Sequence, residues 1–581
     1  MTPPGLGKGF AATRPDFAQL RSGQASWPPK INVMKVAIGL TLTAALTLTS
    51  AQAASLADHL PAGALLTLET RNAGSALDRL SGLIAGVLED SGMDEEVPSE
   101  MVEGIGAMLK DSVGREGLVG VFTVGRSGGR FSPEVLAVAR VGALSRDMAA
   151  ELVPQGKGAR VGNYTFGRSD DMFIGQSGGL IYASSNKALL MSYLGRLSGK
   201  AGPRLNAAST YATPTRAIGA QEISLYANLS AVAKVVRGEF ARMGVPRLLS
   251  PLVDGLDTLG QYAGGLRTTA SGLTTTSAHV VNPQGKDQPL SRMLSHTTDF
   301  TVQEILPADV EAVQARACHP ESGAYLGRWL TRLDLFEPFG FLTDSQLASH
   351  LERSGRYLGD ECAQVTLAGG LKASLNSQDP VDSLRHVVTY QRVKDQAAAQ
   401  AHLPEYARSL NDAVSGLRKT IFKTLTGLKN ADLPGSMGRV GATGIAAGMG
   451  AAKEFDALLG DLKMVYGFRD GYLITAWTEE ALRAALAPAE TTLASSEAFR
   501  GEGLNLKNAG GWTYQPDLAD LNSEDLLSAL PEDLRDEELD DIFGPMAETG
   551  AGLINRFNGM TSQSSVQGNV IIGKTNVRYD W

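Results

Sequence analysis

This sequence of 581 residues is poor in cysteine and histidine, with two and seven of them respectively. Two cysteines are too few for a disulfide-rich scaffold or for a zinc site built from four thiolates. No two histidines stand four residues apart, the spacing with which one helix face presents a pair to zinc. We therefore expect no bound metal and no other cofactor.

Basic residues are also in deficit, because 53 lysines and arginines stand against 62 acidic residues, a formal net charge of −9. Affinity for nucleic acid comes from lysine and arginine that neutralise phosphates, so an acidic chain is a poor candidate for binding DNA or RNA. Without residues 1–53, whose role is considered next, 48 basic and 61 acidic residues remain, a formal charge of −13.

The apolar run Val36–Leu48 falls short of the about 20 residues that a membrane-spanning helix needs. Lys35 precedes this run, and Ala51-Gln52-Ala53 follows it as a small-residue cleavage site. The pattern predicts a secretory signal peptide over residues 34–53, and a buried core helix is the alternative. No transmembrane span is expected after its removal.

Residues 1–33 are rich in proline, glycine and serine and would precede the true start at Met34. We interpret them as a mis-assigned leader and not as part of the fold. Cleavage after the small-residue site would leave a mature chain that begins at Ala54. We expect that chain to be exported and soluble, either in the periplasm or outside the cell.

Hydrophobic residues make up 43% of the sequence and charged residues 20%, as in an ordinary globular protein. One segment occurs twice, at Tyr164–Leu194 and, more clearly, at Leu462–Leu486. Placing Gly178 on Gly471 aligns identical residues without a gap: Leu180 with Leu473, Ile181 with Ile474 and Ala183 with Ala476. Each copy predicts a strand, a tight turn, a strand and a helix that is capped by Ser185 or Thr478.

Similar strand and helix signals surround both copies, which predicts an α+β protein made of two divergent tandem modules. The first module covers about 55–290 and the second about 300–581. Each is expected to be a mostly antiparallel sheet with helices packed on one face. A doubly wound parallel sheet is the alternative. The second module carries an insertion at about 406–450, made of a long helix and a glycine-rich passage.

Both modules open with a Leu-Pro-Ala sequence, at Leu60-Pro61-Ala62 and Leu306-Pro307-Ala308, and the second carries a Gly471-Tyr472-Leu473-Ile474 hairpin. In these features the chain resembles an uncharacterised family of exported bacterial proteins, a domain of unknown function with a duplicated α+β module. The resemblance spans nearly the whole mature chain. It implies a location in the cell envelope and supplies no catalytic residues.

Three glycine-rich motifs invite a catalytic or nucleotide-binding interpretation. Gly568–Thr575 fits the phosphate-loop pattern, but its middle residues favour a strand and too few residues follow for the required helix. The segments 125–129 and 175–179 fit the nucleophile-elbow pattern, yet both join strand to strand, where glycine and serine are ordinary hairpin residues. We interpret all three as turns and assign no catalytic residue.

The predicted inserted helix, about Tyr406 to Leu428, has apolar residues along one stripe and basic residues elsewhere. A core helix explains this pattern, and so does a helix that lies on anionic lipid or on a partner. The candidate membrane or partner surface consists of Arg418, Lys419, Lys423 and Lys429. The glycine-rich passage Gly435–Gly450 is either a mobile flap or a plain loop.

The two cysteines, Cys318 and Cys362, are predicted to form a disulfide, since export would place an even pair in an oxidising compartment. Cys318 closes the first predicted strand of its module and Cys362 opens the second. If those strands are antiparallel neighbours, the two Cα atoms fall within bonding range. Two buried, reduced thiols are the alternative.

Taken together, the sequence favours a cell-envelope protein that acts by binding or scaffolding and not by catalysis. Its partner would be an unknown envelope protein, polymer or lipid. One alternative is a carrier or assembly factor for an apolar ligand or lipid, with the inserted helix and glycine-rich passage as a lid. Another is a hydrolase whose site is assembled from distant residues.

Overall fold

The computed structural model describes residues 55–71, 116–127, 130–143, 158–243, 250–285, 287–333, 344–375, 382–428, 462–516 and 554–580, with single residues between these ranges. Residues 1–41 form a unit that lies outside this description, and every element below belongs to the unit Leu42–Trp581. The predicted leader, signal peptide and Ala54 terminus also lie outside the described residues. Within those residues, no helix has both the length and the apolar character to span a membrane.

The strands between residues 66 and 280 form one half of an antiparallel sheet, in which each strand hydrogen-bonds to the next. From the outer edge inward the order is β4 (Ala159–Val161), β5 (Tyr164–Ser169), β6 (Met172–Ser177), β7 (Leu180–Ser184), β3 (Arg130–Arg140), β2 (Glu116–Ser127), β1 (Leu66–Arg71), β8 (Ile223–Asn228), β9 (Gln261–Thr269) and β10 (Gly272–Val280).

The strands between residues 312 and 579 form the other half and are also antiparallel. From the outer edge inward they are β14 (Val465–Arg469), β15 (Tyr472–Ala476), β13 (Val387–Val393), β12 (Leu358–Thr366), β11 (Ala312–Ala317), β16 (Ala509–Gln515), β17 (Phe557–Gln567) and β18 (Val570–Tyr579).

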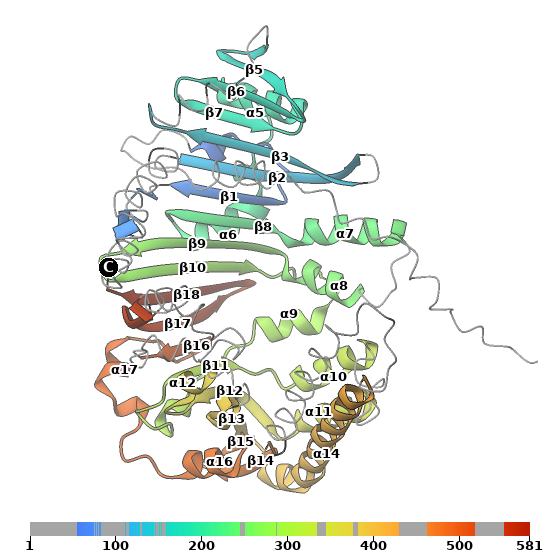
Figure 1. Ribbon diagram of the computed structural model, residues 1–581, viewed down its shortest axis with the longest axis vertical. Helices are drawn as coiled ribbons and strands as arrows, with labels where there is room; N and C mark the ends of the chain where they lie inside the picture. Colours follow the sequence, from blue (N-terminus) through green and yellow to red (C-terminus); the bar gives the residue numbers. More distant parts are fainter. Residues whose placement is uncertain are drawn as a thin grey trace, which may run out of the picture. The chain divides into compact units, whose positions relative to one another are not determined.

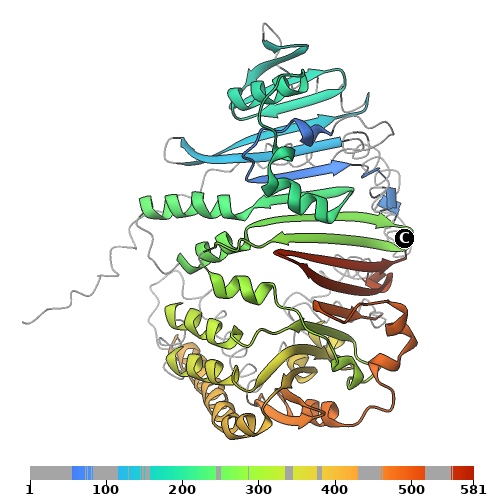
Figure 2. The same cartoon turned by 180° about the vertical axis from the view of Figure 1, so that it is seen from behind.

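The two halves meet where β10 pairs with β18, from Gly272 opposite Arg578 to Val280 opposite Val570. Both views of the ribbon show these two strands side by side (Figures 1 and 2). Outward from this junction the two halves follow the same strand order, and the first half adds β4 and β5 at its far edge. The predicted α+β, antiparallel class is confirmed, and the parallel alternative is wrong. Origin by duplication stays a prediction.

Helices connect the strands of each half. They are α5 (Lys187–Leu197), α6 (Ser209–Ile218), α7 (Leu229–Met243), α8 (Ser250–Leu259), α9 (Gln288–Leu294), α10 (Ser322–Leu333), α11 (Asp344–Ser354), α12 (Gly370–Leu375), α13 (Asp382–Arg385), α14 (Gln396–Leu428), α16 (Glu479–Leu486) and α17 (Glu497–Gly501). Short 3₁₀ turns are η2 (Leu56–His59), η4 (Leu205–Ala207), η6 (Val302–Glu304) and η9 (Leu493–Ser495).

The core of each half lies between one face of the sheet and a helix that follows the outer hairpin. In the first half, Leu190 and Leu194 of α5 pack on Tyr182 of β7. In the second half, α16 packs on Tyr472 and Ile474 of β15. Because strand side chains alternate between faces, this spacing of two residues places each set on one face.

Helix α14 packs on the opposite face from α16. Leu403 of α14 contacts the core around Leu473, whose neighbours Tyr472 and Ile474 face α16. Consecutive strand residues point to opposite faces, so β15 is covered on both sides. In the second half, helices therefore pack on both faces of the sheet and not on one face as expected.

Helix α14 also begins earlier than predicted, at Gln396 and not near Tyr406. Its start is capped by Asp395, whose carboxylate accepts the Ala398 N–H at 2.9 Å. Pro404 lies inside the helix, where a proline costs one hydrogen bond. Packing of Leu403 and its neighbours offsets that loss, which the sequence pattern alone does not reveal.

The alignment of the two hairpins is corrected by one residue. The turn residues are Gly178-Gly179 between β6 and β7, and Asp470-Gly471 between β14 and β15, so Gly179 matches Gly471. All four residues have positive φ, as a two-residue hairpin turn requires. The corrected alignment pairs Leu180 with Tyr472. The alignment expected from the sequence pairs Leu180 with Leu473, whose side chain points to the opposite face of the sheet.

The same slip misplaces one helix cap. Asn186 and not Ser185 caps α5, because its side chain accepts the N–H groups of Ala188 and Leu189. Ser185 instead accepts the Val135 N–H on the neighbouring strand. Thr478 caps α16 as predicted, since its hydroxyl accepts the Ala481 N–H at 3.2 Å.

Candidate functional site

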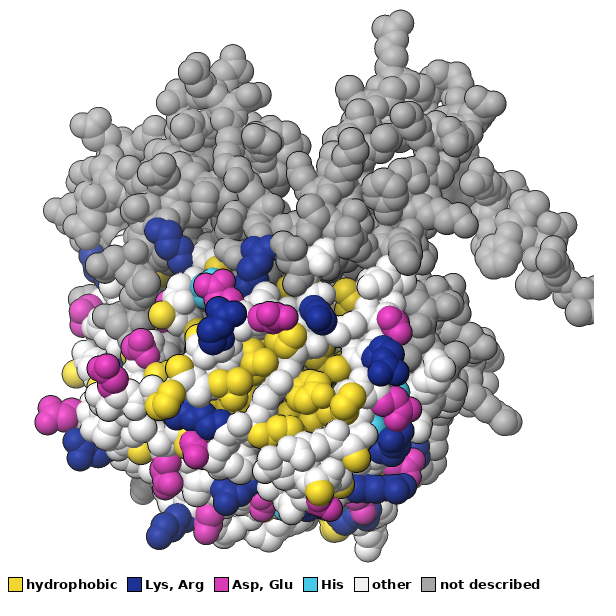
Figure 3. Space-filling view, turned by 90° about the horizontal axis from the view of Figure 1, so that it is seen from below, with side chains coloured by type: hydrophobic (Ala, Val, Ile, Leu, Met, Phe, Trp, Pro, Cys, Tyr) yellow, Lys and Arg dark blue, Asp and Glu magenta, His cyan; other side chains and the backbone are white. Residues whose placement is uncertain are grey.

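A groove of about 790 Å³ runs along the outer strand β14, between α14 and α16. The view from below shows apolar side chains at the centre of this face, bordered by basic and acidic ones (Figure 3). The lining residues come from the two helices and from the start of the strand: Pro404, Ala407, Arg408, Asn411, Asp412, Lys463, Met464, Val465, Tyr466, Glu479, Leu482, Arg483 and Leu486.

Helix α16 supplies the apolar wall on one side of the groove. It buries Ala481 and Ala485 against the sheet, which leaves Leu482 and Leu486 partly exposed at its flank. Leu486 also lies over Gly467, where a Cβ would approach its side chain to 2.8 Å. A glycine in β14 thus makes room for the leucine that shapes the groove.

Helix α14 supplies the opposite wall and holds the end of the strand. The Asn411 amide accepts the Met464 N–H at 2.7 Å and donates to the Met464 carbonyl at 3.3 Å. Two hydrogen bonds from one side chain reproduce the pairing that a neighbouring strand would make. At the N-terminal end of β14, a side chain thus takes the place of a strand among the described residues.

Charged side chains of both signs surround the apolar walls. Arg408 and Asp412 stand on α14, Lys463 precedes β14, and Glu479 and Arg483 stand on α16. A mixed rim around an apolar floor is typical of sites that bind another molecule through buried contact. Among the described lining residues, three basic side chains face two acidic ones, a near balance that does not favour an anion over a cation.

A chain of hydrogen bonds centred on two buried histidines joins α11 to α14. His350 Nδ1 lies 3.0 Å from His402 Nε2, and His350 Nε2 lies 3.1 Å from Ser409 Oγ. At the other end, Tyr357 OH lies 3.1 Å from His402 Nδ1. Both histidine side chains are buried. The chain therefore holds two helices together in a dry environment.

Burial lowers the pKa of His402 to about 4, with smaller contributions from the charge of Arg353 and from His350. Burial also lowers the pKa of His350. The Arg353 guanidinium and the Glu405 carboxylate, 2.9 Å apart, cover the pair from the two helices. Both imidazoles are consequently neutral at pH 7 and can act as donor and acceptor in the chain.

The Ser409 and His350 pair does not have the surroundings of a hydrolytic site. Ser409 lies in the middle of α14, where backbone N–H groups are used within the helix and cannot form an oxyanion hole. The third group is the neutral ring of His402, whereas a triad orients its base with a carboxylate. The geometry favours a structural role for this chain of hydrogen bonds.

We expect acid to destabilise the protein through this histidine pair. The folded-state pKa values lie below the ordinary value for histidine of about 6.5, so the unfolded chain binds protons first. Stability is therefore complete above about pH 6.5 and falls as the pH drops toward about 4. The loss between pH 7 and pH 5 should be on the order of 1 kcal/mol. Urea unfolding at both pH values measures it.

The matched variants for this test are His350→Gln with His402→Gln and, as a control, His319→Gln. The double variant should lose a measurable part of the difference between pH 7 and pH 5, whereas the control should keep it. The remainder comes from His59, His279 and His296, whose pKa values are also lowered by burial. His319 lies outside the buried pair, and its partly exposed ring packs against His296. An unchanged pH dependence in the double variant would refute the assignment.

A glutamate occurs at the matching place in each half; its side chain is fully buried in the second half and 15% exposed in the first. Glu361 of β12 accepts the N–H groups of Thr301 and Val302 at 2.9 and 2.7 Å and the Tyr472 hydroxyl at 2.5 Å. Arg392 lies 3.6 Å from the same carboxylate. These bonds fasten the η6 turn to the sheet.

In the first half, Glu116 of β2 accepts the Leu56 N–H at 2.5 Å and binds Arg140 at 2.7 Å. Leu56 and Val302 each begin the 3₁₀ turn that opens their half. The carboxylate thus supplies an acceptor to orphan N–H groups of a turn in both halves. Sequence reasoning missed both glutamates, because neither stands in a recognisable motif.

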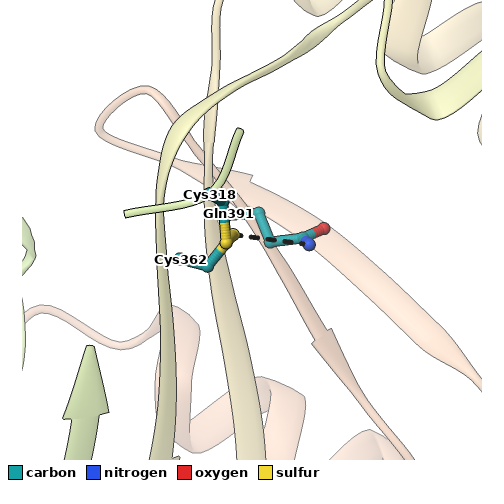
Figure 4. Close-up of a disulfide and its surroundings, with 3 residues drawn as sticks. All are labelled: Cys318, Cys362 and Gln391. Atoms are coloured by element: carbon teal, nitrogen blue, oxygen red, sulfur yellow. Dashed lines mark hydrogen bonds between the residues drawn. A yellow bond between two sulfur atoms is a disulfide. The ribbon is translucent and has the colours of Figure 1, made fainter. Parts of the chain in front are cut away.

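The predicted disulfide is present. Cys318 and Cys362 are bonded, with Cα atoms 5.8 Å apart (Figure 4). Cys318 follows β11, and its N–H donates to the Asp360 carbonyl of β12, so the antiparallel neighbours assumed from the sequence are correct. Gln391 of β13 lies beside the bridge, with its Nε2 3.9 Å from the Cys362 sulfur.

The other predicted site residues are not brought together by the described part of the chain. Arg418, Lys419 and Lys423 fall in α14, but their side chains lie outside the described residues, as do Lys429 and Gly435–Gly450. The phosphate-loop match is a turn, since Gly568-Asn569 joins β17 to β18. Within the described residues, no group of three potential ligands could hold a metal ion.

No protein-family model and no curated protein matches this sequence. Among solved structures, crystal form III of TP0453 is similar with a TM-score of 0.24 and 11% identity, over 42% of this chain and 87% of that chain. Crystal form I of TP0453 gives a TM-score of 0.22 and 14% identity, over 43% and 90%. Likenesses of this size carry no argument about function.

Proposed function

We propose that this chain is an exported cell-envelope protein that acts by binding another envelope component, and that the groove between α14 and α16 is the binding site. One observation carries the proposal: Leu482 and Leu486 line a groove at a strand edge that no described strand pairs, within a rim of mixed charge. Apolar side chains left at such a place favour contact with a partner.

Two further features support export. The apolar segment Val36–Leu48 has the flanks of a secretory signal peptide. The Cys318–Cys362 disulfide suits an oxidising compartment, since such bonds are rare in reducing cytosol. The family resemblance, as an expectation from sequence, points the same way.

The test uses cross-linking in intact cells, with a photoreactive residue at Arg483 on the groove rim. We expect the partner to be captured by the wild-type groove and lost when Leu482→Asp is added, because a charge on the apolar wall would have to be desolvated. Met191→Asp is the matched control. Met191 stands on α5 of the first half and is 42% exposed, so its replacement should leave capture unchanged.

Two outcomes would change the conclusion. Capture that is unaffected by Leu482→Asp would place the binding site elsewhere on the chain. Lipid recovered with the purified protein, and lost from the same variant, would support the second candidate, a carrier of an apolar ligand. The apolar walls and the volume of about 790 Å³ would suit that ligand.

A further inference from the structure

The outer edge of β14 presents backbone groups that no described strand pairs. Val465, Gly467 and Arg469 stand opposite Ala476, Ile474 and Tyr472 of β15, and the tight turn fixes these as the hydrogen-bonded pairs. The alternate residues, Tyr466 and Phe468, direct their N–H and carbonyl groups outward. The bonds between Asn411 and the Met464 backbone agree, because Met464 belongs to this outward-facing set.

The first half shows what occupies the equivalent edge there. Strand β6 matches β14, and its outer edge pairs with β5, from Phe166 opposite Gly175 to Ser169 opposite Met172. The corrected offset places Gly175 on Gly467. One half therefore has a strand at the position where the other has the groove.

Two leucines of the helix that follows each hairpin support this comparison of the two halves. Leu190 and Leu194 of α5 match Leu482 and Leu486 of α16 under the corrected offset. In the first half both leucines are fully buried, in a cluster with Val161 of β4 and Phe166 of β5. In the second half the matching pair remains partly exposed in the groove. A strand beside β14 would complete the burial of this pair.

From this geometry we infer that the groove accepts an extended segment of a partner protein, which adds a strand to the edge of β14 as β5 does to β6. The inference rests on the proposed function and specifies the mode and class of partner. Outward N–H and carbonyl groups at Tyr466 and Phe468 can pair with the backbone of an added strand, whereas an acyl chain has no groups to bond them. The segment should carry apolar side chains on the side that meets Leu482 and Leu486.

The described residues that precede β14 do not form a hairpin of the kind seen in the first half. There, the two-residue turn Asp170-Asp171 leads from β5 directly into β6. Before β14, Gly460 is helical and Lys463 donates its N–H to the Trp477 carbonyl, so the approach to β14 differs. A partner strand is the occupant to which we commit, and a second copy of the chain is an outcome of the test.

The test probe is a synthetic peptide copying residues 163–169, which contain β5, added in trans to the full mature chain. Amide hydrogen exchange should slow at Tyr466 and Phe468 when the peptide is added, because their N–H groups become bonded. The same peptide with alternate backbone nitrogens methylated should bind at least about tenfold more weakly, since it cannot donate to the strand edge.

Variants of Tyr466 separate backbone pairing from side-chain contact. Tyr466→Pro removes an outward N–H and keeps the bonds between β14 and β15, as proline is tolerated on edge strands. Tyr466→Ala loses the same ring but retains the N–H. We expect the proline variant to abolish protection at Phe468 and the alanine variant to keep it. Matched urea midpoints will verify that both variants are folded.

The outcomes distinguish this inference from the proposed function. If cross-linking at Arg483 depends on Leu482 but methylated and unmethylated peptides bind alike, or neither binds, the groove is a binding site and the added strand is wrong. If cross-linking at Arg483 also fails, both the added strand and the proposed function are wrong.

Concentration-dependent dimers that Tyr466→Pro abolishes would show that the added strand comes from a second copy of the chain and not from a partner protein. Binding to phosphatidylglycerol vesicles alone would overturn the inference in favour of lipid.

Discussion

Reduction of the Cys318–Cys362 disulfide is expected to lower the free energy of unfolding by about 4 kcal/mol. The two cysteines are 44 residues apart in sequence, so the bond closes a long loop in the unfolded chain. Opening that loop returns conformational entropy to the unfolded state, and the native contacts of β11 with β12 need not change. Urea unfolding with and without dithiothreitol measures the difference.

The control for this experiment is the double variant Cys318→Ser with Cys362→Ala. It should be destabilised to a similar degree, and dithiothreitol should no longer affect it. Thiol labelling of unreduced protein in denaturant should find no reactive cysteine, and two after reduction. Two reactive thiols without reductant would show that the bond does not form in the native protein.

Glu361→Ala is expected to destabilise the protein by about 3–5 kcal/mol, as does removal of one partner from a buried ion pair. The glutamate side chain is fully buried. Its loss leaves two backbone N–H groups, at Thr301 and Val302, and the Tyr472 hydroxyl without their acceptor. Each buried donor left without an acceptor raises the free energy of the folded state by its desolvation penalty.

Two variants define the origin of that effect. Glu361→Gln retains a carbonyl acceptor and the side-chain volume, so it should cost clearly less than alanine. Glu480→Ala removes an exposed carboxylate from α16 and should stay within about 0.5 kcal/mol of the wild type. Chemical denaturation compares all three. A loss below about 1 kcal/mol for Glu361→Ala would mean that water replaces the carboxylate.

Local patterns in the sequence were sufficient to predict the class of fold and the disulfide. Alternating apolar residues marked the strands, and the positions of Cys318 and Cys362 at facing strand ends carried the correct pairing. The hairpin register was missed by one residue, because identical letters at Leu180 and Leu473 favoured an alignment that strand alternation does not allow. The one-residue error did not change the predicted class of fold, because the same order of strands and helices is predicted in both halves with either alignment.

The candidate site could not be predicted, because its parts meet only in three dimensions. Asn411 reaches Met464 across 53 residues of sequence, and His350 reaches His402 across 52. No spacing rule connects such pairs, whereas helix and strand periods connect only near neighbours. The groove also depends on a difference between the halves: β5 pairs with β6 in the first half, whereas no described strand pairs with the outer edge of β14 in the second. No sequence motif marks such a difference.

The pairing of β10 with β18 has a consequence for the order in which the chain can fold. Val280 pairs with Val570, so 290 residues must be synthesised before the edge of β10 is covered. During that interval a newly made first half presents an open row of backbone donors and acceptors to every other nascent chain. The first half is therefore open to pairing with other chains until synthesis reaches β18.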